Sequence, residues 1–181
     1  IPFLAGILCI LNKKPFVAQT HGMIVLDGRI STKAIDVLFT KPILRKSRKI
    51  LVLTENEMAD VINLRIKAEL EILPNGIEVS LETEIAETKE KTVVFCSRLD
   101  KQKGIDKFIE LASAFREEGI IFEIYGPDGG ELSFVLNEIE SRNLKDSLFY
   151  RGSLQSIDVQ EMLKKAHLLV LPSEKDAFPM I

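Results

Sequence analysis

Two cations and a glycine follow a run of apolar residues in the second half of the chain. Residues 92–104 read TVVFCSRLDKQKG, and the apolar run Val93–Cys96 predicts a buried strand. Arg98 and Lys103 offer positive charge, and an amphipathic helical pattern begins at Gly104. A helix N-terminus attracts anions through its free backbone N–H groups, and nearby cations add full charges. The stretch predicts a phosphate site, although an ordinary strand-to-helix connection with two solvated cations fits the same residues.

Other polar residues and glycines also come directly after predicted strands. Short apolar strands alternate with helical patterns through both halves, which predicts two α/β lobes built on parallel sheets with helices on both faces. In such sheets, ligands bind beyond the carboxyl ends of the strands. The residues at those ends are His21 and Gly22, Arg98 to Lys103, Gly126 to Gly130, Arg151 and Gly152, and Ser173 to Phe178. We expect the binding site at this edge of the sheets.

The composition argues against several classes of protein. With 181 residues, 46% of them hydrophobic, the chain can bury a core in one large domain or two small lobes. The net charge of −3 argues against a general nucleic-acid binder. Cys9 and Cys96 lie in separate apolar segments, which fits a reducing, cytoplasmic compartment rather than a disulfide framework. Because there are only two histidines, a His-rich metal site is not expected.

Two stretches in the first half bear on membranes. The apolar run of residues 1–11 is too short to span a bilayer and has no basic residues before it, so we predict a core helix. A helical pattern over residues 31–49, divided by Pro42, contains the basic cluster Arg45, Lys46, Arg48 and Lys49. The cluster fits a solvated helix C-terminus, or alternatively a peripheral contact with anionic lipid headgroups at the inner face of a membrane.

Five motifs in a fixed order resemble the retaining glycosyltransferases of the group 1 family. A strand ending in Thr20-His21-Gly22 is similar to the His-Gly loop of that family's first lobe, and VLTENEMADVI with LPNGIE to the segment that closes the lobe. FCSRLDKQKGID resembles the phosphate motif, and IYGPDGGE the following strand and glycine loop. FYRGSLQSIDVQEMLKKAHLLVLPSEKDAFP resembles the run that leads into the paired-acidic motif.

The resemblance implies the GT-B architecture, which consists of two Rossmann-like lobes. Residues 1–85 would form the carboxyl-terminal part of the acceptor-side lobe with the link, and residues 86–181 the amino-terminal part of the donor-binding lobe. Both lobes are expected to be incomplete, because the family's first strands and its second acidic residue would lie outside residues 1–181. Ser97 stands where the family usually has Gly, and Asp176 and Ala177 stand at the Glu and Gly of its Pro-Ser-x-x-Glu-Gly-Phe motif.

The resemblance also implies roles for individual residues. Arg98 and Lys103 would bind the diphosphate of a nucleoside-diphosphate sugar, so that no metal or other cofactor is required. His21 would orient the transferred sugar without acting as a nucleophile, and Asp176 would bind the sugar hydroxyls. The residues expected to line the substrate pocket are Gly22, Gly126, Arg151, Gly152, Phe178 and Pro179. The glycines also fit simple turns, and Asp176 also fits an exposed loop acid.

The function implied is hexosyl transfer with retention from a nucleotide sugar to a glycan or lipid-linked acceptor. Such an enzyme would build a surface polysaccharide. Two alternatives stay open at this point. One is a GT-B nucleotide-sugar 2-epimerase, whose product would be a free sugar nucleotide without a new linkage. The other is a non-catalytic fragment that binds a nucleotide sugar.

Overall fold

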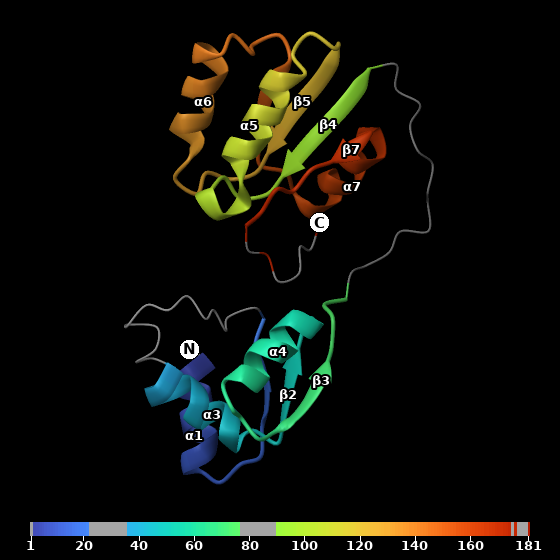
Figure 1. Cartoon of the computed structure of the whole chain (residues 1–181). Coiled ribbons are helices and arrows are strands. Elements are labelled where there is room, and N and C mark those ends of the chain that lie inside the picture. Colours follow the sequence, from blue (N-terminus) through green and yellow to red (C-terminus); the bar gives the residue numbers. More distant parts are fainter. Residues whose placement is uncertain (1, 22–35, 77–89, 175, 177–180) are drawn as a thin grey trace. The chain divides into compact units, whose positions relative to one another are not determined.

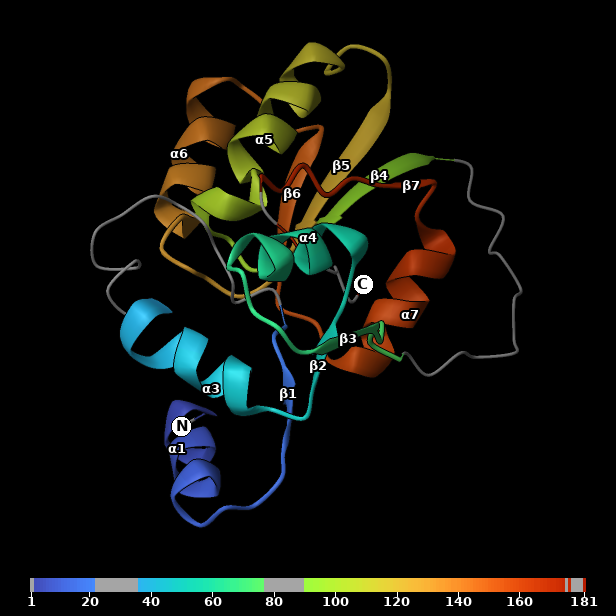
Figure 2. The same ribbon diagram turned by 60° about the horizontal axis from the view of Figure 1, so that its bottom comes forward.

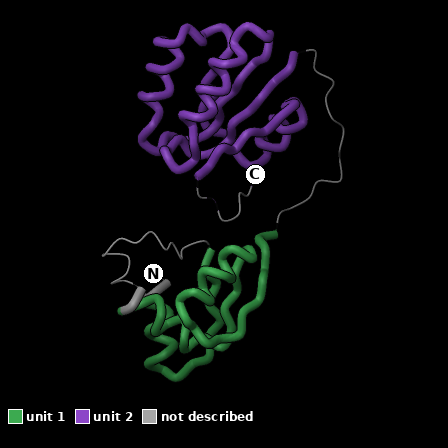
Figure 3. The backbone as a smooth tube through the Cα atoms, in the orientation of Figure 1, with its two compact units in different colours: residues 1–78, 177–180 green, residues 79–176, 181 purple. Residues whose placement is uncertain are grey.

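A computed structural model describes residues 2–21, 36–76, 90–174, 176 and 181. The chain divides into two compact units, whose main bodies are residues 1–78 and 79–176 (Figure 3). The lobe boundary expected at 85/86 lies outside the described residues.

The first unit contains a small parallel sheet, as predicted. Its strands pair in the order β1-β2-β3, and both pairs are parallel. In chain order its elements are α1 (Pro2–Leu11), β1 (Val17–Gln19), the π-helix η1 (Asp36–Thr40), α3 (Lys41–Lys46), β2 (Lys49–Val52), α4 (Glu55–Asn63) and β3 (Glu69–Ile72) (Figure 1).

Local sequence signals set the ends of the helices in this unit. Pro42 lies in the first turn of α3, where its missing N–H costs nothing, so the predicted division of the 31–49 pattern is confirmed in its described part. The Thr54 hydroxyl accepts a hydrogen bond of 3.2 Å from the backbone N–H of Glu57 and thereby caps α4. The apolar pattern predicts α4 to about Lys67, but the helix ends at Asn63 and Arg65 adopts a positive φ of 55°.

The core of the first unit gathers side chains from β2, α3, α4 and the segment that follows α4. Its buried members are Leu44, Ile50, Val52, Val61, Leu64 and Ile66. Helix α1 forms as predicted, but the expectation that it is a core helix is wrong for one side of it. Leu4, Leu8 and Leu11, which follow one another at helical spacing, are 61%, 50% and 71% exposed.

The second unit is a four-stranded parallel sheet between two layers of helices. Its strand order is β6-β5-β4-β7. Helices α5 and α6 lie on one face of the sheet and α7 on the other (Figure 2). In chain order the elements are β4 (Lys91–Cys96), the 3₁₀ turn η2 (Lys101–Lys103), α5 (Ile105–Ala114), β5 (Ile120–Tyr125), α6 (Leu132–Ser141), β6 (Leu148–Gly152), α7 (Ser156–Lys165) and β7 (Leu168–Leu169).

Three phenylalanines form the centre of the second core. Phe108 from α5 packs against Phe95 of β4 and Phe122 of β5, with ring centroids 5.5 and 5.8 Å apart. All three side chains are almost completely buried. Phe115 also falls on the apolar side predicted for α5, but this helix ends at Ala114 and Phe115 is 43% exposed.

The strand order places a topological switch point at β4. The chain runs from β4 to β5 and β6 on one side, then returns through α7 to β7 on the other side of β4. The loops after β4 and β7 therefore leave neighbouring strands at the same edge of the sheet. In open parallel sheets this is where the ligand crevice forms.

Candidate functional site

The loops after β4 and β5 are joined by backbone hydrogen bonds. The Ser97 N–H donates to the Tyr125 carbonyl, and the Leu99 N–H donates to the Pro127 carbonyl, both at 3.0 Å. Gly126 allows this approach, because its φ is 144° and a Cβ there would overlap the carbonyl oxygen of Ser97. Gly126, which was predicted to line the site, thus leaves room for the backbone of Ser97, the residue before Arg98.

Arg98 and Lys103 are organised by one carboxylate that lies between them in the sequence. Asp100 Oδ2 accepts a hydrogen bond of 2.8 Å from Arg98 Nε, and Oδ1 accepts one of 3.1 Å from the Lys103 backbone N–H. Burial raises the pKa of Asp100, but these hydrogen bonds outweigh it and bring the pKa below its ordinary value. The sequence prediction missed Asp100, although an Asp three residues before Lys103 is a recognisable N-cap signal.

Lys103 and Asp176, which are 73 positions apart, form an ion pair at the switch point. The distance from Lys103 Nζ to Asp176 Oδ2 is 2.6 Å, and the two side chains are 22% and 23% exposed. Two further features bring their loops together. The Glu174 N–H donates to the Gln102 carbonyl at 3.0 Å, and a Cβ at Gly104, whose φ is 71°, would overlap the Pro172 carbonyl oxygen. Two of the predicted site residues are therefore in direct contact.

Arg151 and Gly152 lie at the end of β6 and make different contacts. The Gly152 carbonyl accepts a hydrogen bond of 2.9 Å from the Gly126 N–H, which ties it to the β5 loop. Arg151 instead pairs with Glu123 of β5 at 2.8 Å and lies 4.7 Å over the ring of Phe149. The assignment of Arg151 to the nucleotide pocket stays a prediction, and it would require the pair with Glu123 to open.

His21 follows β1 in the first unit, at the carboxyl end of its strand as predicted. It has a positive φ of 47° and is exposed. The preceding Thr20 is buried; its N–H donates to the Leu51 carbonyl at 3.2 Å and its hydroxyl donates to Glu57 Oε1 at 2.6 Å. Glu57 Oε2 accepts from the Leu53 N–H at 2.7 Å. Thr54 and Glu57 have the spacing of a capping box, but that local pattern does not predict that the Glu57 carboxylate also fixes the backbone before His21.

Gly22, Phe178 and Pro179, which were also expected to contact substrate, lie outside the described residues. Their roles stay predictions.

Thr20→Val should weaken the first unit by about 2 kcal/mol, because valine cannot donate the buried hydrogen bond that the Thr20 hydroxyl gives to Glu57. Urea unfolding followed by circular dichroism measures the change. Thr92→Val is the matched control: that hydroxyl makes a 3.4 Å bond to the Glu90 carbonyl at an exposed position, and its loss should change stability by less than about 0.5 kcal/mol. Equal effects of the two substitutions would contradict a special role for the Thr20 contact.

Ser173→Ala should leave stability unchanged or raise it by up to about 1 kcal/mol, since nothing is lost by removing an unsatisfied hydroxyl. Within the described residues, Ser173 Oγ is the buried side-chain polar atom that has no hydrogen-bond partner. Ser47→Ala serves as the contrast, because that buried hydroxyl donates to the Leu44 carbonyl at 2.7 Å. Its removal should cost about 1 kcal/mol in urea unfolding. A larger loss for Ser173→Ala than for Ser47→Ala would show that the Ser173 hydroxyl is bonded.

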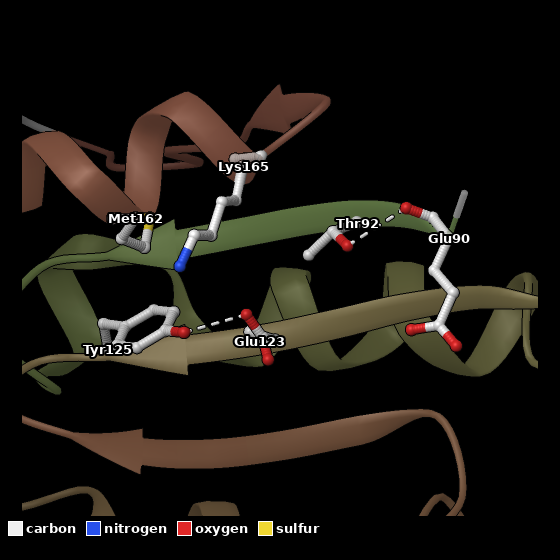
Figure 4. A pocket seen from close by; sticks show the side chains of 7 residues that line it. Glu90, Thr92, Glu123, Tyr125, Met162 and Lys165 are labelled. Carbon is white, nitrogen blue, oxygen red and sulfur yellow. Dashed lines mark hydrogen bonds between the residues drawn. The ribbon is translucent and has the colours of Figure 1, made fainter. Parts of the chain in front are cut away.

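A cavity of about 470 Å³ lies away from the switch point, between the sheet and α7 (Figure 4). Tyr125 and Glu123 of its lining are already engaged: the Tyr125 hydroxyl donates to Glu123 at 2.8 Å, and the same carboxylate binds Arg151. Burial and this hydrogen bond raise the pKa of Tyr125 to about 12, so the phenol does not act as a base near neutral pH. The lining residues are Glu90, Thr92, Glu123, Tyr125, Met162, Lys165 and Ala166. The loop after β4, which carries Arg98 and Lys103 at the switch point, is more suitable for binding an anionic ligand.

The described residues give little further support to a metal or membrane site. They contain no group of three or more side chains of the His, Cys, Asp or Glu type that could share a metal ion.

None of the helices among the described residues has both the length and the apolar character to cross a membrane. In the basic cluster, Lys49 bonds Glu69 and Glu71 at 2.8 and 2.6 Å, which raises its pKa to about 12. The positive charge of Lys49 is thus already paired with two carboxylates of the neighbouring strand.

The family of the chain follows from its second half. The family model described as "Glycosyl transferases group 1" matches residues 78–181, which is more than half of the chain. The chain belongs to this family, as the motifs predicted. No curated protein sequence matches it.

Solved structures share the fold at low sequence identity. HepE of Anabaena in complex with UDP-glucose superposes with a TM-score of 0.81 at 14% identity, over 99% of this chain and 52% of that one. Sucrose-phosphate synthase of Thermosynechococcus elongatus has a TM-score of 0.78 at 18% identity, over 98% and 50%. TarM of S. aureus, a mutant complex with UDP, has a TM-score of 0.72 at 22% identity, over 88% and 32%. These likenesses confirm the GT-B fold, and the chain spans about half or less of each structure.

Proposed function

We propose that the chain is part of a retaining glycosyltransferase that transfers a hexosyl group from a UDP-sugar. The observation that carries the proposal is the meeting of Lys103 with Asp176 at the switch point, where a diphosphate-binding cation and a sugar-binding carboxylate would have to lie side by side. Arg98 stands on the same loop with a side chain that is 63% exposed, so its guanidinium can reach a ligand. Membership of the group 1 family supports the same reaction class.

The proposed chemistry depends on stabilising the leaving group. When the glycosidic bond of a nucleotide sugar breaks, negative charge grows on the diphosphate, and preorganised cations lower the energy of that transition state. Arg98 and Lys103 take this role, so no metal ion is needed. Asp176 accepts hydrogen bonds from the sugar hydroxyls, and His21 orients the transferred sugar.

The choice of donor and acceptor is drawn from structural relatives. HepE was solved with UDP-glucose, TarM with UDP, and the pneumococcal O-GlcNAc transferase GtfA with UDP and GlcNAc, so we propose uridine as the base. WaaB is a lipopolysaccharide outer core galactosyltransferase, and its likeness suggests a glycan or lipid-linked acceptor in surface polysaccharide synthesis. We assign residues 86–181 to the donor side and 1–85 to the acceptor side, with the cytoplasmic face of a membrane as the place of reaction.

Calorimetry with UDP-, GDP- and ADP-sugars tests the donor. Binding of a UDP-sugar in preference to the others is the expected result. A transfer assay with radiolabelled UDP-glucose or UDP-GlcNAc then tests for a new glycosidic linkage, and NMR of the product anomeric proton tests retention. An epimerised free sugar nucleotide would overturn the transferase assignment, and binding without any transfer would leave a nucleotide-sugar-binding role only.

A further inference from the structure

The ion pair between Lys103 and Asp176 has a consequence for which nucleotide the site prefers. The carboxylate lies 2.6 Å from the ammonium, and each side chain is more than three-quarters covered. A diphosphate that binds Lys103 must share or displace this carboxylate. Because the pair is largely removed from water, the repulsion between Asp176 and a bound phosphate is less screened than it would be at an open surface.

The position of Asp176 is held by several contacts. The loop that carries Asp176 is attached to the turn that carries Lys103 by the hydrogen bond from the Glu174 N–H to the Gln102 carbonyl. The carbonyl of Pro172 lies directly against Gly104. One helical turn beyond Lys103, Lys107 pairs with Glu174 at 3.4 Å, but those side chains are 48% and 66% exposed. Of these two ion pairs, only the one between Lys103 and Asp176 is well covered from solvent.

An intact donor and its nucleotide product would meet Asp176 differently. In a UDP-sugar each phosphate carries one negative charge, and the sugar hydroxyls can donate hydrogen bonds to the carboxylate. In UDP the terminal phosphate gains further negative charge near neutral pH and has no hydroxyls to donate. The carboxylate therefore attracts the donor through its sugar and repels the product through its extra charge.

We infer that Asp176 is a specificity-determining residue that makes the site favour the intact nucleotide sugar over the nucleoside diphosphate left after transfer. This inference rests on the proposed function. It adds a role beyond holding the sugar: the carboxylate weakens product binding at Lys103 and so promotes product release.

Calorimetry on the 181-residue chain tests the inference with UDP and UDP-glucose as probes. Asp176→Asn removes the charge but keeps the shape, so UDP should bind about tenfold more tightly, while UDP-glucose should change by less than about threefold. Raising the salt concentration should reduce the difference in UDP affinity between Asp176→Asn and the original protein, because the effect is electrostatic. Glu174→Gln removes the carboxylate charge from the more exposed ion pair with Lys107. This variant should leave the affinities for UDP and for UDP-glucose unchanged.

The outcomes separate the inference from the function on which it depends. Unchanged or weaker UDP binding by Asp176→Asn, or an equal change for both ligands, overturns the inference while the function stands. If the original protein binds neither UDP nor UDP-glucose, the proposed function itself fails and the inference with it. A thermal midpoint measured without ligand controls for folding; a purely structural role would change both affinities in the same direction.

Discussion

Replacing Lys103 with alanine is expected to lower kcat/KM for the donor at least about 10²-fold, because in the proposed mechanism Lys103 stabilises the charge that develops on the leaving diphosphate. Arg98→Ala should have an effect of the same order, since its exposed guanidinium is the other cation on the loop after β4. Steady-state kinetics with a UDP-sugar measures the loss of kcat/KM in each variant, and calorimetry with UDP measures the loss of nucleotide affinity. The unfolding free energy of Arg98→Ala should change little, because the Arg98 side chain is mostly exposed and an exposed ion pair contributes about 1 kcal/mol or less.

Lys107→Ala provides the matched control for this prediction. Lys107 lies four residues after Lys103, in the first turn of α5, and also pairs with a carboxylate, Glu174, but both of those side chains are more exposed. The variant should keep its kcat/KM within about twofold of the original protein. Turnover that survives both Lys103→Ala and Arg98→Ala would remove the diphosphate assignment and with it the proposed mechanism.

Gly126→Ala is expected to destabilise the second unit by about 3 kcal/mol or more. The new methyl group would overlap the Ser97 carbonyl oxygen, and a φ of 144° is unfavourable for any residue with a Cβ. Relief of the overlap would move the backbone before Arg98, so donor affinity should fall together with stability. Since the chain has no tryptophan, urea unfolding is best followed by far-UV circular dichroism.

Gly130→Ala separates backbone strain from steric overlap. Gly130 also has a positive φ, 110°, but a Cβ there would meet no atom within 4 Å. This variant should lose about 1–2 kcal/mol from strain alone. Similar losses for the two variants would show that the contact between the β4 and β5 loops is not what requires glycine at position 126.

The order of strands and helices in each half could be predicted from the sequence because those signals are local. The alternation of apolar runs and amphipathic patterns gave parallel α/β units, and Thr54 with Glu57 marked the start of α4. Prediction failed where periodicity continued past the real end of a helix, as at Phe115. A hydrophobic residue can continue a helical pattern after the backbone hydrogen bonds have stopped, so the pattern by itself overestimates helix length.

That cations and glycines follow the strands could be read from local sequence, because strand, turn and helix preferences act over a few neighbouring residues. Which of these residues contact one another depends on the packing of the whole unit. The return of the chain through α7 to β7 places Asp176 against Lys103 across 73 positions, whereas Arg151 pairs with Glu123 on the face of the sheet. The physical reason is that strand order depends on how helices pack on the two faces of the sheet, which no local preference records.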